Sequence, residues 1–472
     1  MDSDIRPISW TLERLLTATG GICMSGSEGQ VFEGVSIDSR SIKKTDLFVA
    51  ITGQNHDGHG FVEHVLSLGV RGFVLNSKNV DAIACVTNKG CVCVAVEDTT
   101  RALGAMASLQ RKESGVKLVA ITGSNGKTST RAMTAAILEK RFTTLSTQGN
   151  FNNEIGLPLT LLRLSTEHQW AVVEMGMNAP GEISRLAGIA KPDLGIITNV
   201  APAHLEGLGS IENVARAKAE LLDALDPDKR ALLNMGSPLF EALATHCRCK
   251  LFTFGLSDNA QIRASDIRSE TRNVVFNLHA LGKSIPVVLN TPGRFMVENA
   301  LAAAGVGILA GMDLETIKRG LGAFKPVHGR MQIHKSSRGF FVIDDTYNAN
   351  PHSMMAAIDV LCDLKGDAKG ILVAGDMGEL GTSTDELHRS VGKFAVRKRV
   401  DEIYLVGEKA RLIGNAAISD GFNKNSVFTG SKKEIIGTLS KNLEHGNWVL
   451  VKGSRFMAME DIVNDIMVLN GD

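Results

Sequence analysis

Short apolar runs recur along the chain and alternate with longer stretches in which apolar residues return every three or four positions. The short runs predict buried strands, and the stretches between them predict helices that pack on one face. This alternation predicts an α/β protein with mainly parallel sheets. The predicted strands are Leu47–Ile51, Gly72–Leu75, Cys91–Val96, Lys117–Thr122, Trp170–Glu174, Leu194–Val200, Ala231–Asn234, Phe340–Asp344, Gly370–Ala374, Glu402–Val406 and Trp448–Val451.

The predicted strands fall into three blocks, which we interpret as three domains. A chain of 472 residues is long enough for roughly three domains of ordinary size. Residues 1–112 form a small mixed α/β block, residues 113–325 a central block, and residues 326–472 a third block with the same strand–helix alternation. A polar stretch at residues 110–115 predicts a linker. Ligands of open parallel sheets bind beyond the carboxyl ends of the strands, so the turns that follow these strands are where a site is expected.

Composition narrows the possible functions. Lys plus Arg and Asp plus Glu both number 51, so no net basic field favours nucleic acid as a partner. The longest apolar stretch, Ala300–Met312, is shorter than the roughly 18 residues of a membrane span and predicts a packed helix. Acidic residues near the N-terminus argue against a secretory signal, and seven scattered cysteines without zinc-type spacing are typical of reduced thiols. We therefore expect a cytoplasmic protein without a membrane span.

The strongest local signal is the segment 119–130, where a strand, a glycine-bracketed turn and a helix beginning at Lys127 follow one another. A phosphate-binding loop offers ATP and its Mg²⁺ free N–H groups at a helix N-terminus, a lysine and a hydroxyl. Ile121 stands where the general pattern has its first glycine, and a turn that merely ends a strand is the alternative. The residues of the predicted ATP site are Gly123, Ser124, Asn125, Gly126, Lys127, Thr128 and Ser129.

Three more residues are candidates for chemistry. Glu174 ends a predicted strand and His204 follows the next one, so both are expected at the same edge of the sheet. A helix cap and a structural histidine are the alternatives. Lys218 falls on the apolar face of a predicted helix at 210–225, where an unpaired ammonium is rarely found. Either Lys218 belongs to a site or it extends its ammonium to solvent.

Polar turns follow several other predicted strands. Asx turns and helix caps would explain each of them singly, but their recurrence at strand ends favours a site. The residues concerned are Asn150, Asn152, Asn153, Arg330, Asp345 and the turn Lys452–Arg455.

Several motifs resemble those of the Mur ligases, ATP-dependent amide-forming enzymes of peptidoglycan precursor synthesis. TGSNGKTS at 122–129 is similar to the family's phosphate loop. GNFNNEIGLPLTLL at 149–162, DDTYNANPHSM at 344–354 and VAGDMGELG at 373–381 are similar to segments of the members that add D-alanyl-D-alanine. DSR at 38–40 and DGHGF at 57–61 are similar to the family's uridine-nucleotide region. The motifs span nearly the whole chain.

The resemblance implies a small UDP-sugar-binding domain, a central P-loop ATPase and a C-terminal Rossmann-like domain. It implies ATP and Mg²⁺ as cofactors, with Lys127, Glu174, His204 and Lys218 as catalytic residues. Mg²⁺ would be held by Thr128, Glu174, His204 and Lys218, the last carbamylated with CO₂. Asn299, Arg330 and Asp345 join the predicted ATP site. The implied substrate-binding residues are Ser39, Arg40, Asn150, Asn152, Asn153, Tyr347, Asn348 and Asn350.

The implied reaction joins D-alanyl-D-alanine to UDP-MurNAc-tripeptide through an acyl phosphate, in the bacterial cytoplasm and by a monomer. Phe295 and Met296 depart from the family pattern, which often has a His-Asn pair before the Ala-rich helix. The D-N-P-R signature of the diaminopimelate-adding relative is absent. Two alternatives stay open. One is another amide ligase with the same phosphate loop, such as another Mur-type ligase or a folylpolyglutamate synthetase, and the other is a nucleotide-dependent switch without chemistry.

Overall fold

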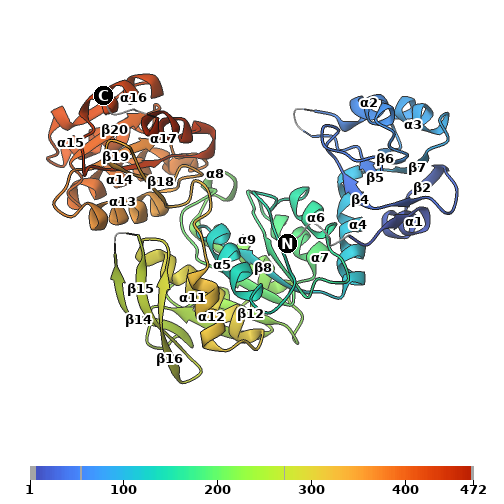
Figure 1. Ribbon diagram of the computed structural model, residues 1–472, viewed down its shortest axis with the longest axis horizontal. Coiled ribbons are helices and arrows are strands. Elements are labelled where there is room, and N and C mark those ends of the chain that lie inside the picture. The colour runs from blue at the N-terminus through green and yellow to red at the C-terminus, as the bar shows by residue number, and fades with distance from the viewer. Residues whose placement is uncertain (1–6, 54–55, 271, 469–472) are drawn as a thin grey trace.

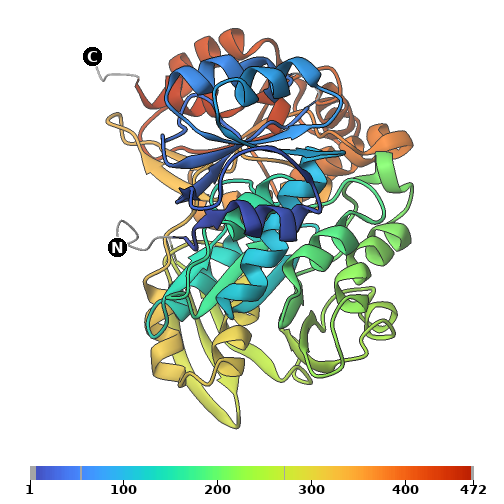
Figure 2. The ribbon, with the colours of Figure 1, turned by 90° about the vertical axis from the view of Figure 1, so that its right-hand side faces the viewer.

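The computed structural model describes residues 7–53, 56–270 and 272–468, which form three bodies, each built on its own sheet (Figure 1). Residues 1–6, where the sequence predicts no secretory signal, lie outside the described residues, as do residues 54–55. The amino-terminal and carboxy-terminal bodies stand on the same side of the central body (Figures 1 and 2). No helix in the described part of the chain is long and apolar enough to cross a membrane.

The amino-terminal body has a five-stranded sheet in the order β2-β7-β6-β5-β4, and the predicted strands at 47–51, 72–75 and 91–96 correspond to β5, β6 and β7. All pairings are parallel except that of β2 with β7. A two-stranded pair, β1 with β3, lies beside it. The elements are β1 Trp10–Thr11, α1 Leu12–Thr19, β2 Ile22–Ser25, β3 Val31–Phe32, β4 Gly34–Ser36, β5 Asp46–Val49, η1 Gly58–Phe61, α2 Val62–Ser67, β6 Gly72–Asn76, α3 Val80–Thr87 and β7 Val92–Val96.

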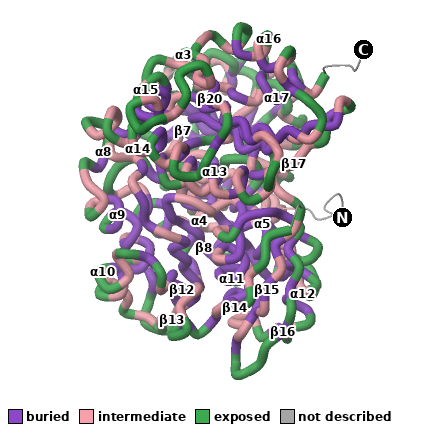
Figure 3. The backbone as a smooth tube through the Cα atoms, turned by 90° about the vertical axis from the view of Figure 1, so that its left-hand side faces the viewer, coloured by how far each residue is buried: buried purple, intermediate pink, exposed green. Residues whose placement is uncertain are grey.

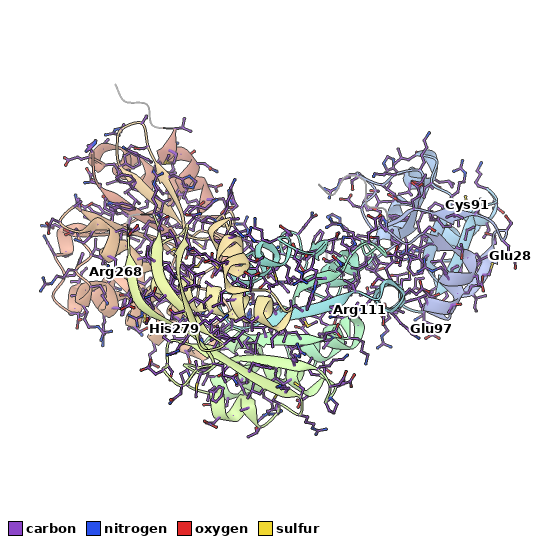
Figure 4. The ribbon with its side chains drawn as sticks, turned by 60° about the horizontal axis from the view of Figure 1, so that its bottom comes forward. Glu28, Cys91, Glu97, Arg111, Arg268 and His279 are labelled. Carbon is purple, nitrogen blue, oxygen red and sulfur yellow. The ribbon has the colours of Figure 1, made fainter. Side chains whose placement is uncertain are left out.

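Helix α4, Thr99–Ser114, joins this body to the central one. The prediction of a linker at 110–115 is wrong, because residues 110–114 form the last part of this helix. Two polar residues of this stretch, Gln110 and Arg111, are buried against carbonyl groups, whereas Lys112 and Glu113 are exposed. Gln110 is fully buried, and its Nε2 donates to a backbone carbonyl 2.7 Å away in the central body. Arg111 ion-pairs with Asp193 at 2.9 Å, at the junction of the two bodies (Figure 4). Hydrogen bonding across the junction thus keeps a polar sequence helical and inside.

The central body has a nine-stranded sheet in the order β16-β15-β14-β13-β12-β11-β8-β10-β9. The strands from β9 to β14 pair in parallel, as the sequence predicts, whereas β14, β15 and β16 form an antiparallel meander that the sequence analysis did not predict. The strands are β8 Lys117–Thr122, β9 Thr144–Ser146, β10 Trp170–Glu174, β11 Leu194–Ile197, β12 Arg230–Asn234, β13 Lys250–Gly255, β14 Ile262–Ser269, β15 Val274–Ala280 and β16 Lys283–Leu289.

Helices cover both faces of this sheet, which is why its strands read as continuous apolar runs. On β8, Leu118 and Ala120 pack into a core shared with α4, α6, α7 and α9, and Val119 and Ile121 pack into one shared with α5, α11 and α12. The strands are accordingly buried along the middle of the body (Figure 3). The helices are α5 Lys127–Leu138, α6 Gly156–Leu161, α7 Glu182–Ala190, α8 Leu205–Leu208, α9 Ile211–Asp223, α10 Phe240–Ala244, α11 Arg294–Leu309 and α12 Leu314–Gly322.

The carboxy-terminal body has a six-stranded sheet in the order β17-β18-β22-β19-β20-β21, parallel except for β17. Phe295 of α11 packs against the core of the central body and also against that of the carboxy-terminal body. The elements are β17 Gln332–Lys335, β18 Phe341–Asp344, α13 Pro351–Lys365, β19 Gly370–Gly375, η2 Gly381–Ser383, α14 Thr384–Arg397, β20 Glu402–Val406, α15 Arg411–Ser419, η3 Lys424–Ser426, β21 Val427–Thr429, α16 Lys432–Asn442, β22 Trp448–Lys452, η4 Arg455–Met457 and α17 Glu460–Met467.

Candidate active site

The turn between β8 and α5 has a backbone that only glycine can supply at two positions. Gly123 and Gly126 have φ of +148° and +80°, in the region that favours glycine. A Cβ at Gly123 would lie 1.9 Å from Thr198 Oγ1, and one at Gly126 would lie 2.2 Å from Asn299 Oδ1. Gly126 caps α5 without a side chain, so the first N–H groups of this 12-residue helix point into open space beside the turn. This is the geometry that binds phosphate.

Lys127, the first residue of α5, is half-buried at this turn. Its Nζ donates to the Gly123 carbonyl at 2.7 Å. Burial lowers the pKa of Lys127 to about 8, an effect that the carboxylate of Glu174 partly offsets. Lys127 therefore lies where an anion would bind, with the carboxylates of Glu174 and Glu379 as the negative charges that act on it.

Glu174 ends β10, which runs parallel to β8, and its side chain is almost completely buried. Arg131 of α5 ion-pairs with it at 2.7 Å, and the Thr128 hydroxyl donates to it at 3.2 Å. The structure therefore brings Glu174 to Lys127 and Thr128, although it lies 46 residues after Thr128 in the chain.

His204 comes from the turn after β11, as predicted, but its contact lies in the other body. Its Nδ1 is 2.6 Å from Glu379 Oε2, and the Glu206 N–H donates to the Glu379 carbonyl at 3.1 Å. Both His204 and Glu379 have left-handed backbones, with φ of +56° and +61°, a strained conformation that clusters at functional sites. The imidazole of His204 beside this carboxyl lowers the pKa of Glu379 below its usual value. The sequence analysis quoted Glu379 within a motif but did not select it.

Lys218 is 1% exposed on α9, so it is buried rather than extended to solvent. Burial, and then the charge of Lys127, lowers the pKa of Lys218 well below its usual value. Within the described residues no carboxylate lies within ion-pair distance of it. A buried amine in this state is nucleophilic, and an anion in its place would suit the neighbouring cation better.

Arg330, Tyr347 and Asp345 stand on the carboxy-terminal wall of the site. Arg330 lies 4.1 Å above the ring of Tyr347. Asp345 accepts from the Met331 N–H at 3.2 Å and ion-pairs with Lys452, which is 1% exposed. Burial lowers the pKa of Lys452, although Asp345 opposes this. The sequence analysis noted the turn that begins at Lys452 but assigned no role to its residues.

A cleft of about 840 Å³ lies between the central and carboxy-terminal bodies, within the roughly 300–1,000 Å³ common for ligand sites. It brings together most of the predicted residues from six separate segments of the chain. Those that line it are Ser124, Asn125, Gly126, Lys127, Thr128, Asn150, Asn152, Asn153, Glu174, His204, Arg330, Tyr347, Asn348 and Asn350, joined by Glu379, Ser454 and Arg455.

Ser39 and Arg40 do not line this cleft, because they belong to the amino-terminal body. The Arg40 guanidinium is exposed and hydrogen-bonds Asp38, lowering the pKa of that carboxyl to about 2. Asn350 is also partly engaged elsewhere. It caps α13 in a capping box and donates to Asn125 Oδ1 at 2.7 Å, so it ties the phosphate loop to the carboxy-terminal body.

Three family models match successive parts of the chain. These are "Mur ligase family, catalytic domain" at residues 31–111, "Mur ligase middle domain" at 121–307 and "Mur ligase, glutamate ligase domain" at 329–455. The chain is 34% identical to a Bacillus subtilis protein over 93% of its own length and 94% of that protein's.

The chain belongs to the Mur ligase family. The Bacillus subtilis relative is named UDP-N-acetylmuramoyl-tripeptide–D-alanyl-D-alanine ligase, as is an Escherichia coli protein that is 35% identical over 97% of this chain and 98% of its own. A crystal structure of MurF from Acinetobacter baumannii superposes with a TM-score of 0.88, at 30% identity, over 98% of this chain and 99% of that one. The MurF ligase of Thermotoga maritima in complex with ADP superposes with a TM-score of 0.81, at 25% identity, over 92% and 97%. These comparisons confirm the α/β fold of a Mur ligase.

The donors present in this Mur ligase fit a magnesium ion that binds together with a nucleotide. Among the residues that the structure describes, no three His, Cys, Asp or Glu side chains are grouped closely enough to hold a metal on their own. The Thr128 hydroxyl and Glu174 carboxylate are nevertheless hard oxygen donors beside the phosphate loop. Mg²⁺ commonly takes one or two carboxylates and completes its shell with substrate phosphates and water.

Proposed function

We propose that this chain uses ATP to join D-alanyl-D-alanine to the terminal carboxylate of UDP-MurNAc-tripeptide, releasing ADP and phosphate. The observation that carries the proposal is the cleft in which a phosphate loop faces the polar turns of a second body. Relatives that carry the name of this reaction match nearly the whole chain, and their activity supports the same assignment here.

In the proposed reaction, a carboxylate oxygen of the tripeptide bonds to the γ-phosphorus of ATP while the bond from that phosphorus to ADP breaks. The amine of D-alanyl-D-alanine then bonds to the acyl carbon, phosphate leaves and the amine loses a proton. Both partners in the first step are anions, so positive charge must be concentrated at the site. Lys127 and the N-terminus of α5 supply it.

We further propose that Thr128, Glu174, His204 and a carbamylated Lys218 hold Mg²⁺ when ATP is bound. The ion would neutralise charge on the phosphates. The burial of Lys218 beside Lys127 supports the carbamate, because a carbamate replaces one of two adjacent cations by an anion. Closure of the two bodies around the cleft would exclude water and protect the acyl phosphate from hydrolysis.

We also propose that the three bodies divide the substrates. Residues 1–112 would bind the UDP end of the sugar nucleotide through Ser39 and Arg40, and residues 113–325 would bind ATP. Residues 326–472 would bind the dipeptide with Tyr347, Asn348 and Asn350. The position of the first two residues outside the cleft, in a body of their own, supports this division.

The test is to incubate the chain with UDP-MurNAc-tripeptide, D-alanyl-D-alanine, ATP and Mg²⁺, and to identify the product by mass spectrometry. We expect UDP-MurNAc-pentapeptide, one phosphate for each amide bond formed, and no product with Lys127→Ala. Phosphate release that needs neither acceptor nor amine would indicate a nucleotide switch instead. Turnover of a folate substrate with glutamate, and none with the dipeptide, would indicate a folylpolyglutamate synthetase.

A further inference from the structure

A second, smaller cavity of about 210 Å³ opens beside the phosphate loop and reaches the carboxy-terminal body. It shares Asn125, Gly126, Thr128, Arg330 and Ser353 with the larger cleft. A nucleoside triphosphate whose phosphates lie on the loop would therefore have this cavity within reach of its base.

Part of the wall of this cavity is apolar, although polar and charged side chains, among them Arg330, Asp345 and Lys452, also line it. Phe295 and Met296 come from the first turn of α11, and Val200, Pro238 and Met331 come from three separate turns. The Phe295 ring lies 2.9 Å from where a Cβ at Gly293 would stand, so the glycine allows the ring to lie against the backbone. Apolar and aromatic walls around a narrow space suit the faces of a planar heteroaromatic ring.

Asn299, which the sequence analysis placed in the nucleotide site, is engaged in holding the phosphate loop. It is 5% exposed, and its Oδ1 accepts from the Thr130 hydroxyl at 3.3 Å and lies against Gly126. Its Nδ2 donates to the Met296 sulfur at 3.5 Å. Asn299 therefore supports the loop from beneath, and the edge of a base must be read by other groups.

Of the polar groups that line the cavity, Glu298 and Ser237 have atoms free to do so. Asn234 donates to Glu298 Oε2 at 2.6 Å and to the Thr198 carbonyl at 3.2 Å, so it fixes the carboxylate of Glu298. Among the described residues no donor reaches the other oxygen of Glu298. The Ser237 hydroxyl is buried, with the residue 9% exposed, and likewise has no hydrogen-bond partner among the described residues. A buried hydroxyl without a partner costs free energy unless a ligand or water completes it.

We infer that Glu298, positioned by Asn234, is the residue that selects adenine, by accepting a hydrogen bond from its exocyclic amino group, and that Ser237 donates to a ring nitrogen. This inference rests on the proposed function, since it takes ATP as the nucleotide on the loop. Adenine presents an amino donor where guanine and hypoxanthine present a carbonyl acceptor. A fixed carboxylate repels that carbonyl and leaves it without a hydrogen-bond partner. This lowers the affinity for guanine or hypoxanthine more than a change in the shape of the cavity would.

The test compares equilibrium binding of ATP, inosine triphosphate and purine riboside triphosphate, which lacks the exocyclic group, to the full chain with Mg²⁺ by calorimetry. The wild type should bind ATP at least ~10-fold more tightly than either analogue. In Glu298→Gln, whose amide can donate to a carbonyl, the ratio of the Kd values for inosine triphosphate and ATP should fall at least ~10-fold. The matched control is Glu315→Gln, the same change at an exposed position of α12, which should keep the wild-type ratio.

Ser237→Ala should weaken ATP binding about 10-fold, since a neutral hydrogen bond to a buried group is lost. Equal affinity of the wild type for ATP and purine riboside triphosphate would overturn the inference without any variant. The inference would also be overturned if Glu298→Gln still bound ATP and formed product, but its ratio of Kd values for inosine triphosphate and ATP stayed within twofold of the wild-type ratio. A wild type that binds none of the three nucleotides would instead contradict the proposed function, and the inference with it.

Discussion

Lys218 shows how a single residue can link burial to chemistry. Its ammonium is removed from solvent, lies near Lys127, and has a pKa well below the usual value. A lowered pKa raises the fraction of the neutral amine, the form that reacts with CO₂, and the proposed carbamate would carry a negative charge beside the proposed metal position.

We expect Lys218→Ala to lose at least about 100-fold in turnover, because it would remove the anion that we propose at this position. Added formate or acetate should restore part of the rate by supplying a carboxylate in the vacated space. The measurement is the initial rate of phosphate release with and without each additive, with Lys140→Ala, at an exposed position, as the control. Full activity of Lys218→Ala without additive would show that the lysine has only a packing role.

His388 of α14 leads to a prediction about pH. It is fully buried, its Nε2 accepts from the Met377 N–H at 3.1 Å, and its Nδ1 lies 2.7 Å from the Thr384 carbonyl. Burial lowers the pKa of His388 below its usual value of about 6.5. By accepting from the Met377 N–H, the neutral ring holds in place the turn that carries Glu379.

Below pH of about 6.5 the unfolded chain takes up a proton at His388 that the folded chain resists, so stability must fall as the pH falls. The slope from this residue is at most about 1.4 kcal/mol per pH unit. The glutamine of His388→Gln does not titrate. We therefore expect the melting temperature of this variant to fall less than that of the wild type between pH 7.5 and pH 5.5. Parallel losses in the two proteins would assign the acid sensitivity to other groups.

Helix α13 illustrates how the end of an element can serve both folding and the site. Its capping residue Asn350 closes a capping box with Ser353 and also donates to Asn125 of the phosphate loop. The position of the loop relative to the carboxy-terminal body therefore depends on how this helix begins.

Asn350→Ala should lower the free energy of unfolding by about 1 kcal/mol, the usual effect of losing a cap, and should also reduce turnover. Ser431→Ala is the matched control, because Ser431 closes a capping box on α16 and does not line the cleft. It should lose similar stability and keep its turnover, both followed by urea unfolding and by rate measurements. If both variants keep full turnover, the contact with Asn125 has no part in the reaction.

At the scale of helices and strands, the sequence predicted the features that depend on a local pattern of residues. The apolar runs and the glycine-bracketed turn located the parallel strands and the phosphate loop, because burial on both faces and a left-handed backbone restrict the residue types allowed. The prediction of a linker at the polar end of α4 was wrong, since the carbonyl groups that accept from Gln110 lie 52 or more residues away in the sequence. The pairing of His204 with Glu379 was missed for the same reason, because only the folded chain brings the two bodies together.

For the whole molecule, the division of the chain at residue 112 stays a prediction, and α4 bears directly on it. Most of this helix is packed into a core that spans the amino-terminal and central bodies, with Leu103, Met106 and Ala107 among its buried residues. A cut at residue 113 would remove that helix and expose the surface beneath it, whereas a cut before Asp98 would keep it.

We therefore expect a fragment of residues 97–472 to fold, to bind ATP as the full chain does, and to lose affinity for UDP-MurNAc-tripeptide. A fragment of residues 113–472 should melt at a lower temperature, since apolar surface covered by α4 becomes exposed. Melting followed by circular dichroism and binding followed by calorimetry test both statements. Unchanged affinity of the folded 97–472 fragment for the sugar nucleotide would contradict the proposed role of the amino-terminal body.

Phe295 packs against the hydrophobic cores of both the central and the carboxy-terminal body. Separation of the two bodies at this point would expose the Phe295 ring to solvent. The loss of buried aromatic surface therefore disfavours separation there. Rotation about the ring preserves the contact, and displacement grows with distance from the axis. The base cavity includes Phe295 and the substrate cleft does not, so we expect a swing of this body to leave the nucleotide base nearly still while the amide product is released.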